Sequence, residues 1–312
     1  MSGVRRRPVV DQGPGRPALT PRELLLWVGS ITGYLFGAFA FVTIEVSVGG
    51  AWFRTGPDLD AYLRAGRDLL AGAPVYVGQI GEPTNFPYAP TWVVIAAALT
   101  LLPPLLVQAA IVVLDLIAIR YVAGSWRGTG LVLLWPLTAF ELSAGNIDLL
   151  IAAAIVLAWS TTLDDDLGLP DPSRRLGQLV AGVGQVGGLV LVALAKLAPA
   201  LALPPARWRS ALIALVICVA VTLPWLFLWP EWFAYLLRQP ATIAISLPVG
   251  PWYLRLPIAL VLAALGSFVL RRPWLSALAV FVAMPSLYLS TTVILIAPIR
   301  LWLDSRPARR GA

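Results

Sequence analysis

The chain is organised around residues 57–90, which read PDLDAYLRAGRDLLAGAPVYVGQIGEPTNFPYAP. This stretch is polar in an otherwise apolar sequence, and it holds 4 of the 16 carboxylates of the chain together with two arginines and three tyrosines. The sequence that follows consists of hydrophobic runs separated by short polar joints. A polar loop that membrane helices hold at one face of a bilayer is the place where we expect chemistry.

Composition indicates that the solvent of this fold is lipid. Hydrophobic residues make up 59% of the 312 residues and charged residues 12%, and the mean hydropathy is +0.81. A soluble domain is about a quarter charged. The chain has no histidine and a single cysteine, Cys218, which excludes histidine-based catalysis, an intrachain disulfide and Cys/His metal sites. The net charge of +7 is mostly arginine, which in a membrane protein is more typical of cytoplasmic loops than of nucleic-acid binding.

The placement of arginines predicts the domain organisation and the orientation. Residues 1–22 are rich in Arg, Pro and Gly, and we expect a disordered, basic, cytoplasmic N-terminus. The apolar run 24–48 is long enough to carry the chain outward across the cell membrane. We predict one transmembrane domain over residues 23–303, with a first outer loop at 49–104, and a basic cytoplasmic tail at 304–312.

Several apolar runs have the wrong length for a single span. Residues 91–102 are too few to cross a hydrocarbon core of about 30 Å, so we expect them to lie along the outer interface or to dip in and return. Residues 176–206 lie between two arginine clusters that we place in the cytoplasm, which predicts two half-depth helices broken near Lys196; one ordinary span is the alternative. We expect another hairpin at 274–302, broken at Met284-Pro285. The other runs are residues 105–122, 130–142, 149–161, 211–229 and 256–270, so the predicted fold class is an all-α, polytopic membrane helical bundle.

Short motifs in this order resemble glycosyltransferase family 87. The first loop carries DLDAY at 58–62, AGRDLLAG at 65–72, PVY at 74–76 and FPYAP at 86–90. GNIDLL at 145–150 is similar to the family's "GQxNxLL" turn, with Asn146 where Gln is usual. GLVLVALAKLAP at 188–199, followed by RWR at 207–209, is similar to its Gly-rich "K-x-x-P" helix with a basic end. The resemblance covers about residues 25–300.

The resemblance implies a fold and a reaction. The fold is the C-type glycosyltransferase fold, with a large first extracytoplasmic loop and re-entrant hairpins. The reaction moves a sugar, most often mannose, from a polyprenyl-phosphate donor to an extracytoplasmic glycolipid or polysaccharide acceptor, with inversion. The partners are therefore the bilayer, this donor and this acceptor, and no nucleic acid. The resemblance makes no cofactor certain, and it leaves open whether a divalent metal lies beside Asp58.

The family's first-loop aspartate, in D-x-x-x-Y, acts as the general base, and the matching residue here is Asp58, with Tyr62 four residues on. Chemistry agrees, because a sugar hydroxyl is a poor nucleophile and a carboxylate within hydrogen-bond reach can take its proton. Asp58 can equally cap the helix that starts after Pro57. Asp60 and Glu82 are the second-choice carboxylates, although an i,i+4 ion pair with Arg64 would make Asp60 structural.

A departing phosphate needs cations, and arginine presents paired donors that suit phosphate oxygens. We expect an arginine-lined hollow beside Asp58. The residues predicted to bind the donor phosphate are Arg64, Arg67, Arg238, Arg255 and Lys196. A lysine that snorkels to the interface is the alternative for Lys196.

A further set of residues is predicted to contact the sugar or the lipid: Tyr62, Tyr76, Tyr88, Asn146, Asp148, Trp252 and Tyr288. For the aromatic residues the alternative is anchoring at the interface, and for Asp148 it is capping the span that follows. Family members often carry a histidine near the position of Tyr288, and this chain has none, which leaves open whether activity is altered or lost. The competing functions are a transporter or flippase of lipid-linked sugars and a catalytically inactive homologue with a scaffolding role.

Overall fold

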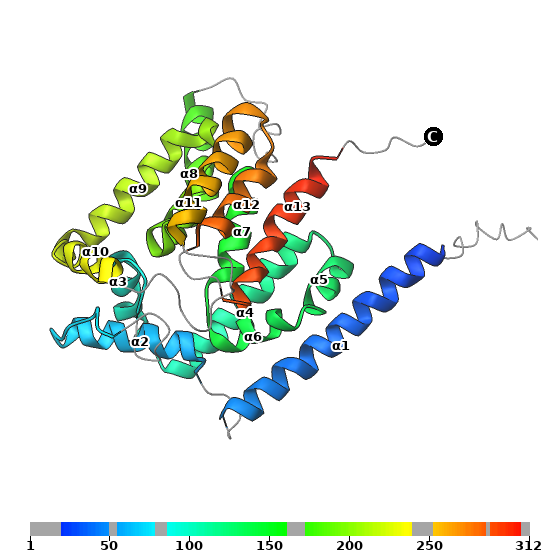
Figure 1. The fold of residues 1–312 in the computed structure, drawn as a ribbon, viewed down its shortest axis with the longest axis horizontal. Coiled ribbons are helices and arrows are strands. Elements are labelled where there is room, and N and C mark those ends of the chain that lie inside the picture. Colours follow the sequence, from blue (N-terminus) through cyan, green and yellow to red (C-terminus); the bar gives the residue numbers. More distant parts are fainter. Residues whose placement is uncertain are drawn as a thin grey trace, which may run out of the picture.

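The computed structural model describes residues 20–49, 55–78, 86–160, 172–238, 252–284 and 288–306. Within these ranges the protein is all-helical, with no strand (Figure 1). The α-helices are α1 (Pro21–Gly49), α2 (Pro57–Leu70), α3 (Pro90–Leu99), α4 (Pro104–Ala123), α5 (Trp126–Leu133), α6 (Pro136–Ala144), α7 (Asp148–Trp159), α8 (Pro172–Lys196), α9 (Trp208–Thr222), α10 (Leu228–Arg238), α11 (Trp252–Ala264), α12 (Pro273–Ala283) and α13 (Ile296–Asp304). Short 3₁₀ turns are η1 (Ala198–Ala202), η2 (Pro205–Arg207), η3 (Leu223–Trp225) and η5 (Ser290–Leu295), and η4 (Leu265–Val269) is a π-helical end of α11.

The lengths and compositions of the helices fit a membrane protein. Three stretches of the described chain are long and apolar enough to cross a bilayer, namely Pro21–Val46, Pro104–Ala123 and Pro205–Trp225. The pair α6 and α7, bent by 105° at residues 145–147, supplies a fourth if it is taken as one broken span. The predicted fold class is therefore confirmed at the level of an all-helical protein with apolar candidate spans.

Proline starts many of these helices because its fixed φ suits the first helical turn, where its missing N–H is not needed. Pro57, Pro90, Pro104, Pro136 and Pro273 each stand at the start of a helix. The prediction of one apolar run over residues 130–142 is wrong, because Pro136 starts a new helix inside it. Trp135 is extended, with ψ 113°, and the run divides there into α5 and α6.

The predicted break near Lys196 is present, but the predicted second half-helix does not form. α8 runs unbroken to Lys196, where Leu197 takes a positive φ of 57°. The chain then returns along α7 as 3₁₀ turns. A hydrogen bond from the indole N–H of Trp159 to the Ala202 carbonyl, at 2.7 Å, joins this returning segment to α7. Arg207 Nη2 donates to the carbonyl of Ser160 at 2.9 Å. Lys196 therefore lies near the start of α7, and Arg207 lies beyond its end.

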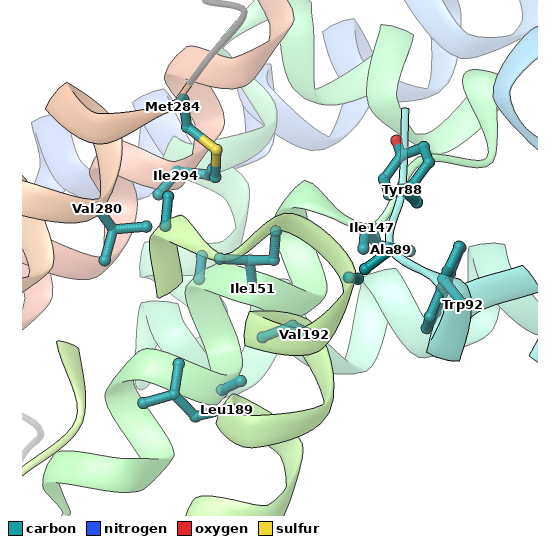
Figure 2. Packing of buried hydrophobic residues seen from close by; sticks show 14 of the residues in the cluster. Tyr88, Ala89, Trp92, Ile147, Ile151, Leu189, Val192, Val280, Met284 and Ile294 are labelled. Atoms are coloured by element: carbon teal, nitrogen blue, oxygen red, sulfur yellow. The ribbon is translucent and has the colours of Figure 1, made fainter. Parts of the chain in front are cut away.

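Close backbone contacts and one apolar cluster hold the helices together. A Cβ on Gly33 of α1 would overlap the carbonyl of Gly130 in α5, so these two helices pack backbone to backbone. In the interior, Ile151 of α7 shares a cluster with Val192 of α8 and Val280 of α12 (Figure 2). The central helices thus form a single packed body.

The bundle has two distinct ends. α2 lies across one of them, roughly perpendicular to α7 and α13 (Figure 1). There the side chain of Gln108, in the first turns of α4, accepts from Gly56 N–H at 3.0 Å and donates to the Leu142 carbonyl at 3.3 Å. We call this the Asp58 end. From Gln108, α4 runs about 18 Å, at 1.5 Å per residue, to Arg120 at the opposite end, which we call the arginine end.

Candidate functional site

The position of Asp58 follows from how α2 docks. A Cβ on Gly56, just before the helix, would overlap the carbonyl of Ser143. A Cβ on Gly66 would lie 2.6 Å from backbone atoms of Ala96 in α3. Glycine at both positions lets α2 touch backbone on two sides, which fixes its rotation and depth. Asp58, in its first turn, is left partly buried.

Next to Asp58, three polar side chains from distant segments meet. The hydroxyls of Tyr62 and Tyr88 are 2.9 Å apart, and each lies 3.3 Å from Asn146 Oδ1. Burial raises the pKa of both tyrosine hydroxyls above their usual value, so both stay protonated and available as donors. This brings together residues from α2, the FPYAP segment and the bend between α6 and α7.

An ion pair completes the cluster. The Nζ of Lys196, at the end of α8, lies 2.5 Å from Asp148 Oδ1, at the start of α7. The same ammonium lies 5.3 Å from the centre of the Tyr88 ring, in cation–π contact. Asp148 is fully buried, and its Oδ2 has no hydrogen-bond partner among the described residues. Capping of α7, the alternative for Asp148, is not observed, since Ile147 is the N-cap residue and no side chain caps the helix.

The surroundings of Asp58 favour a protonated carboxyl more than water does. Burial raises the pKa of Asp58 to about 6, the positive charge of Lys196 opposes the rise, and the negative charge of Asp148 adds to it. A carboxyl with this pKa is mostly ionised at pH 7 and is a stronger base than an exposed aspartate. Asp58 therefore has the properties of a general base.

The sequence analysis missed Glu141 in this cluster. Its side chain is fully buried in α6, and its Oε1 accepts from Asn146 Nδ2 at 3.3 Å. Glu141 thereby orients the amide so that Asn146 Oδ1 faces the two tyrosines. A carboxylate inside an apolar run is rare enough to have been a signal. The same holds for Asp115 of α4, which is fully buried with neither oxygen hydrogen-bonded within the described ranges.

The FPYAP segment is held by backbone contacts on several sides. The Tyr76 hydroxyl donates to the Tyr88 carbonyl at 3.2 Å, and Trp232 Nε1 of α10 donates to the Pro87 carbonyl at 3.1 Å. Ala89 N–H donates to the Ala195 carbonyl at 3.0 Å, one residue before Lys196. Tyr76 is buried, with its ring 5.8 Å from that of Tyr235. Its observed role is to hold Tyr88 in place.

The other predicted carboxylates are not in the cluster. Asp60 is exposed and accepts a short hydrogen bond from the Thr55 hydroxyl. The expected ion pair between Asp60 and Arg64 is wrong, since no such pair forms within 4 Å in the part of the chain that the structure describes. Glu82 lies outside the described residues.

The structure does not gather the predicted arginines around Asp58. Arg67 and Arg238 are exposed, and each donates to a carbonyl of its own helix, Leu63 at 3.2 Å and Ala234 at 3.1 Å. Arg255 is buried and donates to the Val282 carbonyl at 3.0 Å, which ties α11 to α12. The expectation of an arginine-lined hollow is corrected accordingly: the cation that acts on Asp58 is Lys196.

Three further predicted residues lie on helix faces or helix ends. Arg64 is half-buried on α2. Trp252 begins α11, and its side chain lies outside the described part of the structure. Tyr288 is half-buried ahead of η5, where its carbonyl accepts from Thr291 N–H at 3.1 Å.

Together these groups can bind a polar ligand and move a proton. The cluster presents a carboxylate of raised pKa, two hydroxyl donors, one amide and one ammonium, which suits a hydroxyl-rich ligand that carries an anion. Across the described ranges, no group of three or more His, Cys, Asp or Glu side chains is arranged to hold a metal ion. Comparisons with protein-family models, with characterised proteins and with solved structures found no significant match to this chain.

Proposed function

We propose that the protein is an integral-membrane glycosyltransferase of the family 87 type, with the C-type fold. It transfers a sugar, with mannose as the first candidate, from a polyprenyl-phosphate donor to an extracytoplasmic glycolipid or polysaccharide. The proposed orientation in the cell membrane puts both termini and the arginine end in the cytoplasm, which agrees with the preference of arginine for cytoplasmic loops.

One observation supports this proposal above the others. The residues in the motifs that resemble the family come from α2, the FPYAP segment, the α6–α7 bend and the end of α8, yet they lie in one contact cluster. Tyr62 contacts Tyr88 and Asn146, and Lys196 contacts Tyr88 and Asp148. Helices that merely span a bilayer have no need to collect their polar residues at a single point.

The proposed step uses Asp58 as the base. Its carboxylate takes the proton of the acceptor hydroxyl while that oxygen bonds to the anomeric carbon. The bond from the anomeric carbon to the phosphate oxygen breaks, and polyprenyl phosphate leaves with the electron pair. Attack from the face opposite the phosphate inverts the anomeric centre. Lys196, the cation of the cluster, stabilises the departing phosphate, and Tyr62, Tyr88 and Asn146 supply donors and an acceptor for sugar hydroxyls.

The experiment is transfer from radiolabelled polyprenyl-phosphate mannose, and from its arabinofuranose counterpart, into membranes of a deletion strain. Wild type, Asp58→Asn and Asp60→Asn are compared at equal protein level. We expect Asp58→Asn to lose about 10²- to 10⁴-fold in turnover while it retains donor binding. Asp60→Asn, whose carboxylate is exposed and bonded to Thr55, should stay active. Absence of transfer from both donors by the wild type overturns the proposal.

A lipid-linked sugar transporter is the second candidate, because of two features inside the bundle. Asp115 is a buried carboxylate halfway along a spanning helix, and α8 breaks at Leu197 beside a buried ion pair. Broken helices with internal charge are typical of transporters. A transporter would move the labelled donor across vesicles without forming a glycoside, and Asp58→Asn would barely alter its rate.

A further inference from the structure

The arginine end carries arginine side chains stacked on tryptophan rings, from segments far apart in the sequence. The guanidinium of Arg127 lies 4.3 Å from the Trp27 ring centre, and that of Arg120 lies 5.0 Å from the Trp126 ring centre. On α13 and the turn after it, the Arg306 guanidinium lies 3.5 Å from the Trp302 ring centre. We call these six residues the arginine–tryptophan patch.

The three pairs occupy one region. Trp126 and Arg127 are neighbours in the chain, so the first two pairs adjoin. Gly124, just before them, is covered by the guanidinium of Arg300, since a Cβ there would overlap Arg300 Nη1. Trp302 lies two residues after Arg300 on α13, so the third pair is at the same end of the bundle but on another face of that helix. The ends of α1, α4, α5 and α13 therefore meet at the patch.

The patch exposes its tryptophan rings, and its arginines make no close ion pair with a described carboxylate. The carboxylate of Glu23 acts electrostatically on Arg127, but from beyond 4 Å. Trp126 is 67% exposed, Trp27 38% and Trp302 40%. No ion pair joins Arg120, Arg127 or Arg306 to a carboxylate within the described ranges, and the nearby Asp304 is occupied by Arg300 at 2.9 Å. Indole rings prefer the headgroup level of a bilayer, where one edge is wet.

We propose that the arginine–tryptophan patch binds the headgroups of anionic phospholipids. Stacking on an indole fixes the plane of each guanidinium and leaves its N–H edge free for two phosphate oxygens. Basic residues at a membrane surface attract anionic lipids. The inference does not depend on the proposed enzymatic activity.

The test uses purified full-length protein in a neutral detergent. Dioleoylphosphatidylglycerol or dioleoylphosphatidylcholine is added, and retained lipid is counted by native mass spectrometry. The variant is Arg120→Gln/Arg127→Gln. Its matched control, Arg67→Gln/Arg238→Gln, removes the same charge from two exposed arginines outside the patch, on α2 and α10. We expect the affinity for phosphatidylglycerol to fall about fivefold for each patch arginine removed, and to be retained in the control.

Several results would overturn the proposal. These are an equal fall in both double variants, equal retention of the two lipids by the wild type, or displacement of phosphatidylglycerol by inorganic phosphate at equal concentration. Arg127 also joins α5 to α1, so the variant must elute as wild type on size exclusion. If the double variant elutes differently from wild type, Arg306→Gln replaces it in the test, because Arg306 is an exposed residue beyond the end of α13. Unchanged phosphatidylglycerol affinity in Arg306→Gln would then count against the patch.

Discussion

Lys196 Nζ and Asp148 Oδ1 lie 2.5 Å apart although 48 positions separate the residues in the chain. The pair joins the end of α8 to the start of α7 at the bend that also presents Asn146. It therefore connects two helices, and both of its charges act on the carboxyl of the candidate base.

Removing one partner of this pair should lower the stability of the fold much more than removing both partners. Lys196→Met or Asp148→Leu leaves an unpaired buried charge, and we expect each to lower the free energy of unfolding by about 3–5 kcal/mol. The double variant should lose clearly less than the sum of the two. Unfolding in mixed detergent micelles measures all three. The exposed pair Arg300–Asp304 is the control, and removing one of its partners should lower the free energy of unfolding by about 1 kcal/mol or less. Additive losses at Lys196 and Asp148 would contradict a coupled pair.

The proposed transfer should depend on the ionisation of Asp58. Because burial raises the pKa of Asp58 to about 6, the initial rate should rise with pH through about 6 and level off above 7. The charge of Lys196 opposes the rise in the pKa of Asp58, so Lys196→Gln should move the rising part of the pH–rate profile to higher pH. A profile that is flat from pH 5 to pH 8 under chemistry-limited conditions would exclude Asp58 as the base.

The same raised pKa has a consequence for stability. The folded protein binds this proton more tightly than the unfolded chain, whose aspartate pKa is about 3.9. The stabilisation from Asp58 is thus fully present below about pH 4 and is lost as the pH rises through about 6. Asp58→Asn should then flatten the pH dependence of stability in this window, without destabilising the protein at pH 7.

Glu141 should act by positioning Asn146 rather than by its charge. Glu141→Gln keeps an acceptor for Asn146 Nδ2 and should retain most of the transfer rate. Glu141→Leu leaves that amide N–H unpaired, so we expect a loss of about 1–3 kcal/mol in stability together with a higher KM. Steady-state kinetics of both variants separate the two roles. If Glu141→Gln folds normally and still loses kcat, Glu141 takes part in the proton transfer itself.

Two glycines at the Asp58 end should not tolerate a methyl group. Gly145 has φ 71°, and its Cβ would lie 2.9 Å from that of Leu59. At Gly56 the added methyl would overlap the Ser143 carbonyl. We expect Gly56→Ala and Gly145→Ala each to lower the thermal midpoint and the activity together. Gly184→Ala, in α8 with open space around it, should instead stabilise by about 0.5–1 kcal/mol. Thermal unfolding of the three variants ranks them.

The sequence predicted the grouping of polar residues better than it predicted side-chain directions. Tyr62, Tyr88, Asn146 and Lys196 were named as site residues from the family resemblance, and their contacts place them in one cluster. The prediction for Arg64 and Arg67 failed because the motif does not say which face of α2 is docked. The face that packs carries Leu59, Tyr62, Leu63 and Gly66, at the helical spacing of 3 and 4, and Arg67 points away from it.

Helix breaks were predicted where charges flank an apolar run and were missed where a single proline inside the run causes them. The break near Lys196 was expected from the placement of charges on either side, whereas Pro136 was overlooked inside an apolar run. Glu141 was overlooked for the same reason, because hydrophobicity averaged over the run hides a single carboxylate. Its role depends on the bend at residues 145–147, where the sequence predicts a turn but not its angle of 105°.

The turn at Leu197 has a consequence for how this protein is inserted during synthesis. Arg207 donates to the carbonyl of Ser160, so in the proposed membrane orientation the segment between them would begin and finish on one side of the bilayer. A topology prediction that counts this segment as a single crossing would reverse the predicted orientation of every later helix. Cysteines placed at Ser160 and Arg207 should therefore react alike with a reagent that cannot permeate the bilayer.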